Sequence, residues 1–235
     1  MSVEYLPEKN VTRYLAYFDL LGTQELIQAK KIRQVFAAYA IANKKLAAWS
    51  KRHPQVAQAW FSDTFILYTK DDSAQSFRAI EIVCRWFVYS LLRNRIPVRG
   101  ALACGEFYAD VRTRSYLGEA LLEAYEWGEN QDWIGFILSP SAASRLESVG
   151  LAPQEKLNYR AHDVCFKKKP NGVCTVSIAC LLGNWIKSGN DENFLLRPLR
   201  EMCNKQSDKR VRDKYERTIA FLEKYDTVGL VRNGS

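Results

Sequence analysis

Apolar residues in the first half of the chain recur at two spacings, one typical of strands and one typical of helices. Residues 13–19 form a run of aromatic and aliphatic residues that predicts a strand, and Gly22 follows it as a breaker. Residues 24–50 predict one long helix, because apolar side chains recur there every three or four positions. The members of this stripe are Ile32, Val35, Phe36, Tyr39, Leu46 and Trp49.

Two short strand-like segments, 56–61 and 64–69, are separated only by Ser62 and Asp63. We expect a hairpin with a two-residue loop, although neither residue is the Gly or Asn that such turns favour. A departure from local preference is typical of functional positions. Residues 71–73 then predict the start of a second helix. Its apolar stripe is Phe77, Ile80, Cys84, Phe87, Val88 and Leu91.

The second half of the chain predicts the remaining elements. They are a strand at 97–105, a hairpin arm at 106–113, a helix that Gly118 begins, a strand at 133–139, a short helix at 140–148, strands at 157–166 and 173–182, and a helical tail from about 192. In that tail, one face carries Val211, Tyr215, Ile219 and Leu222.

The order strand, helix, strand, strand, helix, strand predicts an α/β (α+β) sandwich of ferredoxin-like type. Helices of this length can cover a face of the sheet. We expect one domain over residues 1–190, with a C-terminal helical extension over residues 191–235 packed on the same domain.

Composition narrows the class of protein. The chain has 235 residues, of which 47% are hydrophobic, so a disordered chain is excluded. No apolar run approaches the roughly 18 residues of a spanning helix, and residues 1–10 do not resemble a signal peptide. We therefore expect a cytoplasmic protein without a membrane partner. The six cysteines lack a C-x-x-C pair and lie mostly in apolar runs, which favours buried thiols over metal or redox roles.

The net charge of +8 favours anionic partners. Basic residues are dense in segment 205–217, but acidic residues alternate with them at helical spacing, as in Asp208 with Arg212 and Asp213 with Arg217. Such pairs are typical of a solvated, salt-bridged helix and not of a stripe that follows phosphates. We therefore do not expect nucleic acid as the partner.

Three segments carry candidate chemistry. Asp19 ends the first strand, Asp63 lies at the hairpin tip, and Arg99 lies on the strand that follows Pro97. Two carboxylates at neighbouring strand ends suit Mg²⁺ or Mn²⁺, and a guanidinium binds phosphate oxygens in a fork. The alternatives are two ordinary turn carboxylates and an arginine in a salt bridge on the strand face.

These segments together resemble the class III nucleotidyl cyclase domain. The resemblance rests on the order FDLLG, long helix, hairpin with Asp at its tip, VRGALACG and YLGEALLEA, and it covers residues 13–182. It implies that Asp19 and Asp63, with the backbone carbonyl of Leu20, hold two metal ions, Mn²⁺ or Mg²⁺. It also implies that the turn at 20–23 binds the triphosphate and that a head-to-tail homodimer forms sites between its subunits.

Four positions depart from the family pattern. The pair that reads a purine base corresponds to Ala59 and Ser115, and the transition-state Asn and Arg correspond to Leu122 and Glu126. A cyclase domain with its metal aspartates but no purine-reading pair resembles the pyrimidine cyclases of bacterial Pycsar antiphage systems. That resemblance implies the conversion of UTP or CTP to a cyclic mononucleotide, cUMP or cCMP, as a signal in antiviral defence.

We expect Arg99 to act as the catalytic cation. Tyr17 and Trp60 are candidates to fill the space beside a small base, although core packing is an alternative for both. The expected substrate-binding residues are Tyr17, Phe18, Leu21, Gly22, Thr23 and Trp60. Two other functions stay open: a cyclase-like sensor that binds nucleotide without turnover, and a basic nucleic-acid-binding module.

Overall fold

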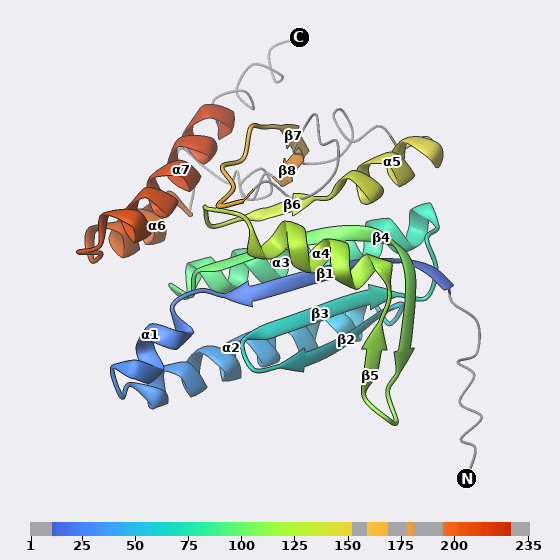
Figure 1. Ribbon diagram of the computed structural model, residues 1–235, viewed down its shortest axis with the longest axis horizontal. Coiled ribbons are helices and arrows are strands. Elements are labelled where there is room, and N and C mark those ends of the chain that lie inside the picture. The colour runs from blue at the N-terminus through green and yellow to red at the C-terminus, as the bar shows by residue number, and fades with distance from the viewer. Residues whose placement is uncertain (1–10, 152–158, 169–177, 181–194, 227–235) are drawn as a thin grey trace.

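The computed structural model describes residues 11–151, 159–168, 178–180 and 195–226 (Figure 1). Its elements are β1 (Val11–Leu20), α1 (Thr23–Gln28), α2 (Ile32–Arg52), β2 (Val56–Phe61), β3 (Thr64–Thr69), α3 (Ala74–Arg93), β4 (Val98–Asp110), β5 (Ser115–Leu117), α4 (Glu119–Glu129), β6 (Phe136–Leu138), α5 (Pro140–Ser148), β7 (Tyr159–Ala161), β8 (Ile178–Cys180), α6 (Leu196–Asn204) and α7 (Lys209–Asp226).

The strands form one sheet in the order β2-β3-β1-β4-β6-β8-β7, and β5 pairs with the far end of β4. Only the β4–β6 pair is parallel among the pairs in this sheet. In the central register, Asp19 of β1 lies opposite Thr64 of β3 on one side and Arg99 of β4 on the other. The register therefore places Asp19 beside Arg99, and Asp63 directly precedes Thr64 at the same end of the sheet.

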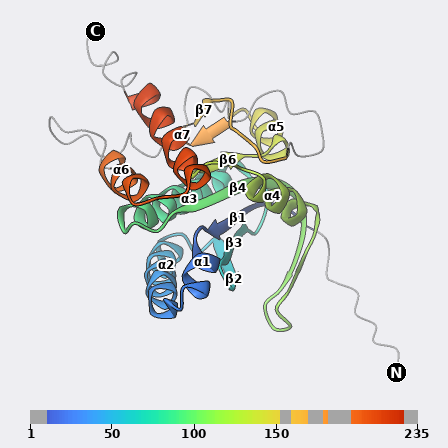
Figure 2. The same cartoon turned by 60° about the vertical axis from the view of Figure 1, so that its left-hand side comes forward.

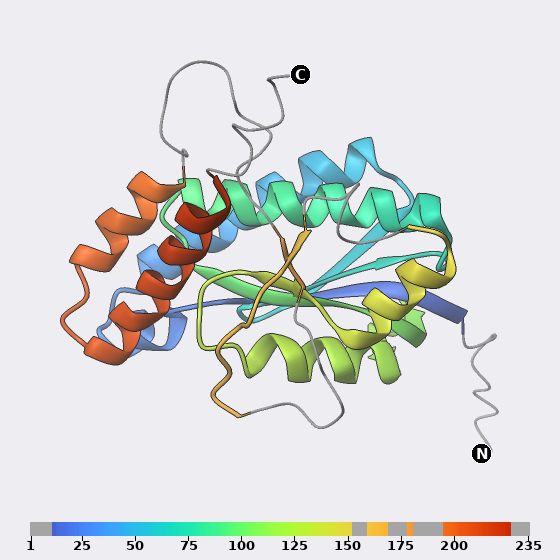
Figure 3. The same cartoon turned by 90° about the horizontal axis from the view of Figure 1, so that it is seen from above.

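Helices cover both faces of this sheet, with α2 and α3 on one side and α4 on the other (Figure 3). Successive residues of a strand point to opposite faces, and β1 follows this rule. Phe18 lies in the core under α3, where its ring packs 4.9 Å from that of Phe136 and 5.1 Å from that of Phe87. Tyr17 belongs to the smaller core under α4. Asp19 is therefore on the α4 face.

The predicted apolar stripe of α3 is confirmed, since all six of its members are buried. The hairpin with the two-residue loop is confirmed as well: Phe61 pairs with Thr64, and Ser62 has a positive φ of 54°. Ser73 begins α3 by accepting a hydrogen bond from the amide of Ser76, as residues 71–73 predicted.

The prediction of one helix over 24–50 is wrong, because Lys30 has a φ of 57° and separates α1 from α2. A helical residue cannot adopt that angle. Ile32 and Phe36, predicted on the buried face, are exposed.

The hairpin arm predicted at 106–113 is also wrong, since β4 continues without interruption to Asp110.

Only Tyr159–Ala161 and Ile178–Cys180 of the two last predicted strands lie in strands within the described residues. Lys169 and Cys174 lie outside the described residues. Cys84, Cys104 and Cys203 are buried, as predicted, but Cys165 is exposed. No helix in the described part of the chain is long and apolar enough to cross a membrane.

The C-terminal helices α6 and α7 pack against the same end of the sheet as α1 (Figures 1 and 2). Tyr215 and Leu222 of α7 are buried, and Val211 and Ile219 pack beside them. The face predicted for this helix is therefore confirmed. The boundary predicted at residues 190 and 191 lies outside the described residues and stays a prediction.

Two glycines of β4 should differ in how much an alanine in their place lowers stability. A Cβ at Gly100 would lie 2.3 Å from the carbonyl oxygen of Tyr17, whereas a Cβ at Gly105 would meet nothing closer than 3.4 Å. We expect Gly100→Ala to lower the free energy of unfolding by about 2–3 kcal/mol, because backbone must shift. Gly105→Ala, the matched control, should change it by less than about 1 kcal/mol. Urea unfolding of both variants tests this, and equal values would contradict it.

Candidate active site

The two candidate metal aspartates lie side by side at the end of the central strands. Asp63 occupies the tip of the β2–β3 hairpin, and its carbonyl accepts a hydrogen bond from the amide of Leu20 at 3.1 Å. Asp19 lies one residue before Leu20, at the last ladder position that β1 shares with β3. This hydrogen bond therefore fixes the hairpin tip against the end of β1.

Thr23 connects the turn after β1 with Asp63. Its buried hydroxyl lies 2.7 Å from the carbonyl oxygen of Leu20 and 2.8 Å from Oδ2 of Asp63. A hydroxyl has one hydrogen to donate, so these two acceptors share it. The contact orients the Asp63 carboxylate and leaves its other oxygen for a ligand.

Arg99 is a buried guanidinium between two carboxylates. Its Nε donates to Oδ2 of Asp19 at 2.9 Å, and its NH2 lies 2.8 Å from the same oxygen and 2.5 Å from Oε2 of Glu129. Its NH1 donates to the backbone carbonyl of Glu129 at 2.6 Å. The salt bridge considered for Arg99 from the sequence is therefore present.

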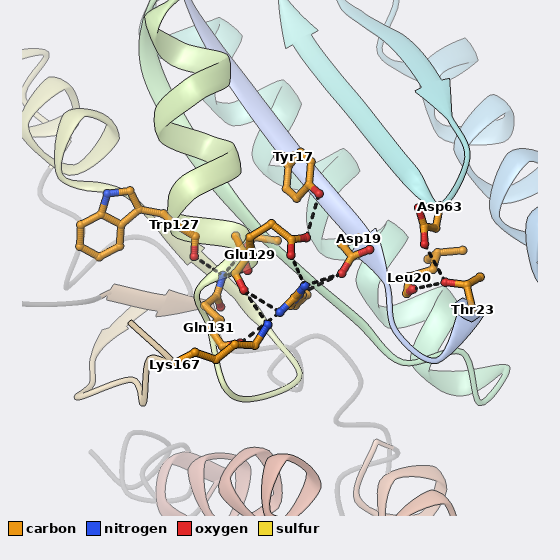
Figure 4. A network of polar contacts seen from close by, with 12 residues as sticks. Tyr17, Asp19, Leu20, Thr23, Asp63, Trp127, Glu129, Gln131 and Lys167 are labelled. Atoms are coloured by element: carbon orange, nitrogen blue, oxygen red, sulfur yellow. Dashed lines mark hydrogen bonds and ion pairs between the residues drawn. The ribbon is translucent and has the colours of Figure 1, made fainter. Parts of the chain in front are cut away.

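Glu129, at the end of α4, is a site residue that sequence reasoning missed. Its Oε1 accepts a hydrogen bond from the hydroxyl of Tyr17 at 2.9 Å, and its carbonyl accepts one from Nζ of Lys167 at 2.9 Å (Figure 4). The only signal was the polar cluster of residues 129–132, between a helix and a strand. Glu129 thus joins four segments around Arg99.

Gln131 fixes the end of α4 against β4, beside Glu129 and Arg99. Its buried amide nitrogen donates to the carbonyl of Gly100 at 2.9 Å and to that of Trp127 at 3.0 Å. Its oxygen accepts a hydrogen bond from the indole of Trp133 at 2.6 Å. A β-bridge to Phe166 places the neighbouring Lys167 beside the site.

Burial raises the pKa of the Asp19 carboxyl from its ordinary 3.8 to about 7. Arg99 opposes this shift, while the negative charges of Glu129 and Asp63 add to it. The charges of three carboxylates thus act on one another here, and Arg99 pairs with two of them, Asp19 and Glu129. A cation bound at Asp19 and Asp63 would relieve their mutual repulsion.

These residues line a cavity of about 1030 Å³. That is at the upper end of the range for small-molecule sites and admits a nucleotide-sized ligand. Of the residues expected from the sequence, the lining contains Tyr17, Asp19, Leu20, Leu21, Gly22, Thr23, Asp63 and Arg99. These residues therefore lie around one cavity, and their roles in binding or catalysis stay a prediction.

Phe18 and Trp60 do not line this cavity. Phe18 is fully buried in the core under α3, so its side chain has no access to a substrate. Trp60 is 54% exposed on β2 beside Tyr39, so core packing is not its role either. Tyr17 packs its ring against Tyr125 at 5.4 Å and presents its hydroxyl to Glu129.

The turn at 20–23 has fewer amides for an anion than its sequence suggests. The amide of Leu20 is bonded to Asp63, and that of Leu21 donates to the carbonyl of Pro97 at 2.9 Å. Gly22 adopts a φ of 84° before α1. Among the described residues, only the amides of Gly22 and Thr23 in this turn lack a backbone acceptor.

The donor set at this corner fits a divalent cation. Asp19, Asp63 and the carbonyl of Leu20 offer only oxygen atoms, which Mg²⁺ and Mn²⁺ prefer. Within the described ranges, no group of three or more His, Cys, Asp or Glu residues forms a complete cage. A bound ion would therefore take further oxygens from water or from phosphate.

The four departures from the family pattern lie away from this corner. Leu122 and Glu126 are on α4, where Leu122 is exposed and Glu126 half-buried. Ala59 lies on β2 and Ser115 on β5. Neither α4 side chain lines the cavity within one protomer.

Solved structures similar to this protein are cyclase domains. The catalytic core of a rhodopsin-guanylyl cyclase with converted specificity, in complex with ATPαS, has a TM-score of 0.59, 13% identity, and coverage of 74% of this chain and 98% of that chain. The guanylate cyclase domain of RhGC from Catenaria anguillulae, in complex with GTP, has a TM-score of 0.54, 11% identity, and coverage of 73% and 96%.

The guanylyl cyclase domain of the RhoGC fusion protein from Blastocladiella emersonii, in a dimeric form, has a TM-score of 0.53, 14% identity, and coverage of 74% and 98%. No protein family and no curated protein matches the chain by sequence. The similarity at this level of identity shows the fold. The predicted fold, that of class III nucleotidyl cyclase domains, is therefore confirmed.

The raised pKa of Asp19 predicts how the stability of the metal-free protein depends on pH. Between pH 4 and pH 7 the unfolded chain loses this proton while the folded protein keeps it, so the free energy of unfolding falls as pH rises. Asp19→Asn removes that contribution. The loss of stability between pH 4 and pH 8, measured by urea unfolding with a chelator present, should be smaller in Asp19→Asn than in the wild type.

Asp163→Asn is the control for this measurement, because Asp163 is exposed and outside the cavity. It should keep the wild-type dependence on pH. An Asp19→Asn variant with the same pH dependence as the wild type would contradict a raised pKa at Asp19.

Proposed function

We propose that the protein is a metal-dependent pyrimidine nucleotide cyclase that converts UTP or CTP into a 3′,5′-cyclic mononucleotide and pyrophosphate. The observation that carries this proposal is the convergence of Asp19, Asp63 and Arg99 on one cavity in a fold shared with cyclase domains. The similar structures include one solved with ATPαS and one solved with GTP. A nucleoside triphosphate is therefore the substrate class that the fold supports.

In this proposal, Asp19, Asp63 and the carbonyl of Leu20 would hold two Mn²⁺ or Mg²⁺ ions. Such ions lower the pKa of an attacking hydroxyl and offset negative charge on phosphate. The 3′-oxygen forms a bond to the α-phosphorus, the bond to the β-phosphate oxygen breaks, and the hydroxyl proton is released. The side chains contribute position and charge, because the carboxylates are fixed by Arg99 and Thr23.

Arg99 supplies positive charge at the same corner. Glu129 binds it through both its carboxylate and its carbonyl, so Arg99 stays anchored when a cation takes up the charge of Asp19. Its guanidinium then has donors free for phosphate oxygens. Tyr17 positions Glu129 through its hydroxyl.

The choice of a pyrimidine rests on Ala59 and Ser115, which lack the side chains that read adenine or guanine in the family. The resemblance to Pycsar cyclases supports a role for the cyclic product as a signal in antiviral defence.

A cyclase-like sensor without turnover is the second candidate function. The exposed Leu122 favours it, because leucine cannot donate a hydrogen bond to a transition state.

We propose that the protein is a homodimer with sites between its subunits. Two groups of exposed apolar side chains support this proposal. Phe36 and Phe61 lie on α2 and β2, and Leu122 and Tyr125 lie on α4, across the sheet. Two distinct apolar surfaces suit head-to-tail pairing, in which each surface of one copy covers the other surface of its partner.

The cyclase proposal predicts the products of an assay with each of the four nucleoside triphosphates and Mn²⁺ or Mg²⁺. We expect a cyclic mononucleotide and pyrophosphate from UTP or CTP, quantified by mass spectrometry. Asp19→Asn and Asp63→Asn should each lower the rate by ~100-fold or more, because each removes a carboxylate that would bind the cation. Asp163→Asn, an exposed control, should retain the wild-type rate.

Three outcomes would contradict this proposal in different ways. A purine product from ATP or GTP would overturn the pyrimidine assignment and keep the cyclase. Binding of nucleotide without any product would favour the sensor. Binding of DNA or RNA with a steep salt dependence, and no nucleotide binding, would favour the nucleic-acid module.

The dimer proposal predicts that a charge in either apolar surface separates the subunits. Phe61→Glu and Leu122→Glu should each weaken dimerisation about tenfold or more, because an unpaired carboxylate would be buried. Ala220→Glu, on the exposed side of α7, is the control and should stay dimeric. Sedimentation velocity over a range of concentrations measures the effect, and a monomeric wild type would overturn the proposal.

A further inference from the structure

The C-terminal helices form one wall of the cavity that contains Asp19 and Arg99. Among the described residues, this wall consists of Met202, Lys205, Gln206, Val211, Lys214 and Tyr215. The helices α6 and α7 lie at the same end of the sheet as α1 (Figure 2), and residues of α1 and of the turn after β1 line the same cavity. The cavity is therefore not built from the β1, β3 and β4 corner alone.

Buried contacts fix α7 relative to the candidate active site. The hydroxyl of Thr218 donates to the carbonyl of Ile134 at 2.8 Å and accepts from its amide at 3.0 Å. Arg217 forms a salt bridge with Asp132, and its NH1 donates to the carbonyl of Asp132 at 2.7 Å. The segment 129–134 therefore contacts Arg99 through Glu129 and contacts α7 through Asp132 and Ile134.

The helix α6 is fixed as well. Glu201 accepts hydrogen bonds from Arg95 at 2.6 and 2.8 Å, and Arg200 of α6 lies 2.8 Å from Glu223 of α7. These contacts set the position of the link between α6 and α7, where Lys205 lies. The wall is therefore positioned by at least two independent sets of polar contacts.

The two lysines of this wall differ from nearby arginines of α6 and α7 that do not line the cavity. Arg200, Arg212 and Arg217 each form an ion pair. Lys205 and Lys214 form no ion pair or side-chain hydrogen bond with another described residue, and both line the cavity. Lys214 is half-buried, and an anion bound in the cavity would give its ammonium a partner of opposite charge.

Lys214 also lies close enough to the site to affect its charges. The pKa of the Lys167 ammonium is lowered by its burial first and by Arg99 next, with Lys214 adding to the shift against the opposing charge of Glu129. Cations from β4, from the segment after β7 and from α7 thus face one space. Such a concentration of positive charge suits a polyanion.

We propose that Lys205 and Lys214 bind the terminal phosphates of the triphosphate, so that the C-terminal helices complete the substrate site. The inference rests on the proposed function in treating the cavity as a triphosphate site. The α-phosphate belongs at Asp19 and Asp63, and the lysines of the facing wall meet the β- and γ-phosphates. Lysine suits this role because its ammonium is a compact charge with three donors.

The test is a calorimetric titration of the full-length protein, in Mg²⁺, with inorganic tripolyphosphate, UTP and UMP. Lys214→Ala and the double variant Lys205→Ala/Lys214→Ala should weaken binding of tripolyphosphate and UTP about tenfold or more, since each loses a charged hydrogen bond. Binding of UMP, which has no terminal phosphates, should change less than about twofold. Lys214→Arg should retain most of the affinity for tripolyphosphate.

Lys209→Ala is the matched control, because Lys209 is an exposed lysine at the start of the same helix and does not line the cavity. It should bind tripolyphosphate as the wild type does. A thermal melt of each variant checks the fold, and Lys214→Gln, which removes the charge but keeps most of the length of the side chain, replaces the alanine variants if they unfold.

The inference and the proposed function fail separately. Wild-type affinity for tripolyphosphate in the double variant overturns the inference even if the protein makes a cyclic nucleotide. Failure of the wild type to bind tripolyphosphate overturns it as well. Lysine-dependent binding of tripolyphosphate supports it even if no cyclic product is formed from any nucleotide.

Discussion

The buried guanidinium of Arg99 is the interaction on which the rest of the site depends. An unpaired buried charge costs several kcal/mol, so both of its carboxylate partners are held by the need to satisfy it. Asp19 comes from β1 and Glu129 from the end of α4, while Arg99 itself lies on β4. One ion-pair network therefore fixes the central strands to the helix above them. Tyr17 and Lys167 then join this network through Glu129.

The register of the sheet decides which residues this network includes. Asp19 lies between Thr64 and Arg99, and Asp63 precedes Thr64 at the hairpin tip. A shift of one residue would turn Asp19 to the face of Phe18, into the apolar core. Gly100 protects the register, because any side chain there would meet the backbone of Tyr17. The position of two carboxylates in space thus depends on a glycine that touches neither of them.

Local patterns in the sequence predicted most of the fold and several of the residues that line the cavity. The stripe of α3 and the two-residue hairpin were readable because both depend on neighbours in sequence. The break at Lys30 was not readable, since nothing in its sequence requires a positive φ. Glu129 and Lys214 were missed for another reason: Glu129 contacts Arg99, 30 positions away in sequence, and Lys214 lines the cavity from α7, far along the chain from Asp19. Trp60, predicted as a bulky residue beside a small base, does not line the cavity, because its side chain is exposed on β2 next to Tyr39.

The perturbed groups around the cavity show what kind of ligand its charges suit. Burial and neighbouring acids raise the pKa of Asp19, and burial and neighbouring cations lower that of Lys167, so both groups would gain from an added partner of opposite charge. A cation alone would relieve the acids and increase the repulsion among the lysines, and an anion alone would do the reverse. A divalent cation bound to a polyphosphate carries both charges. In the proposed site, Lys205 and Lys214 would meet the polyphosphate, and Asp19 and Asp63 would meet the divalent cation.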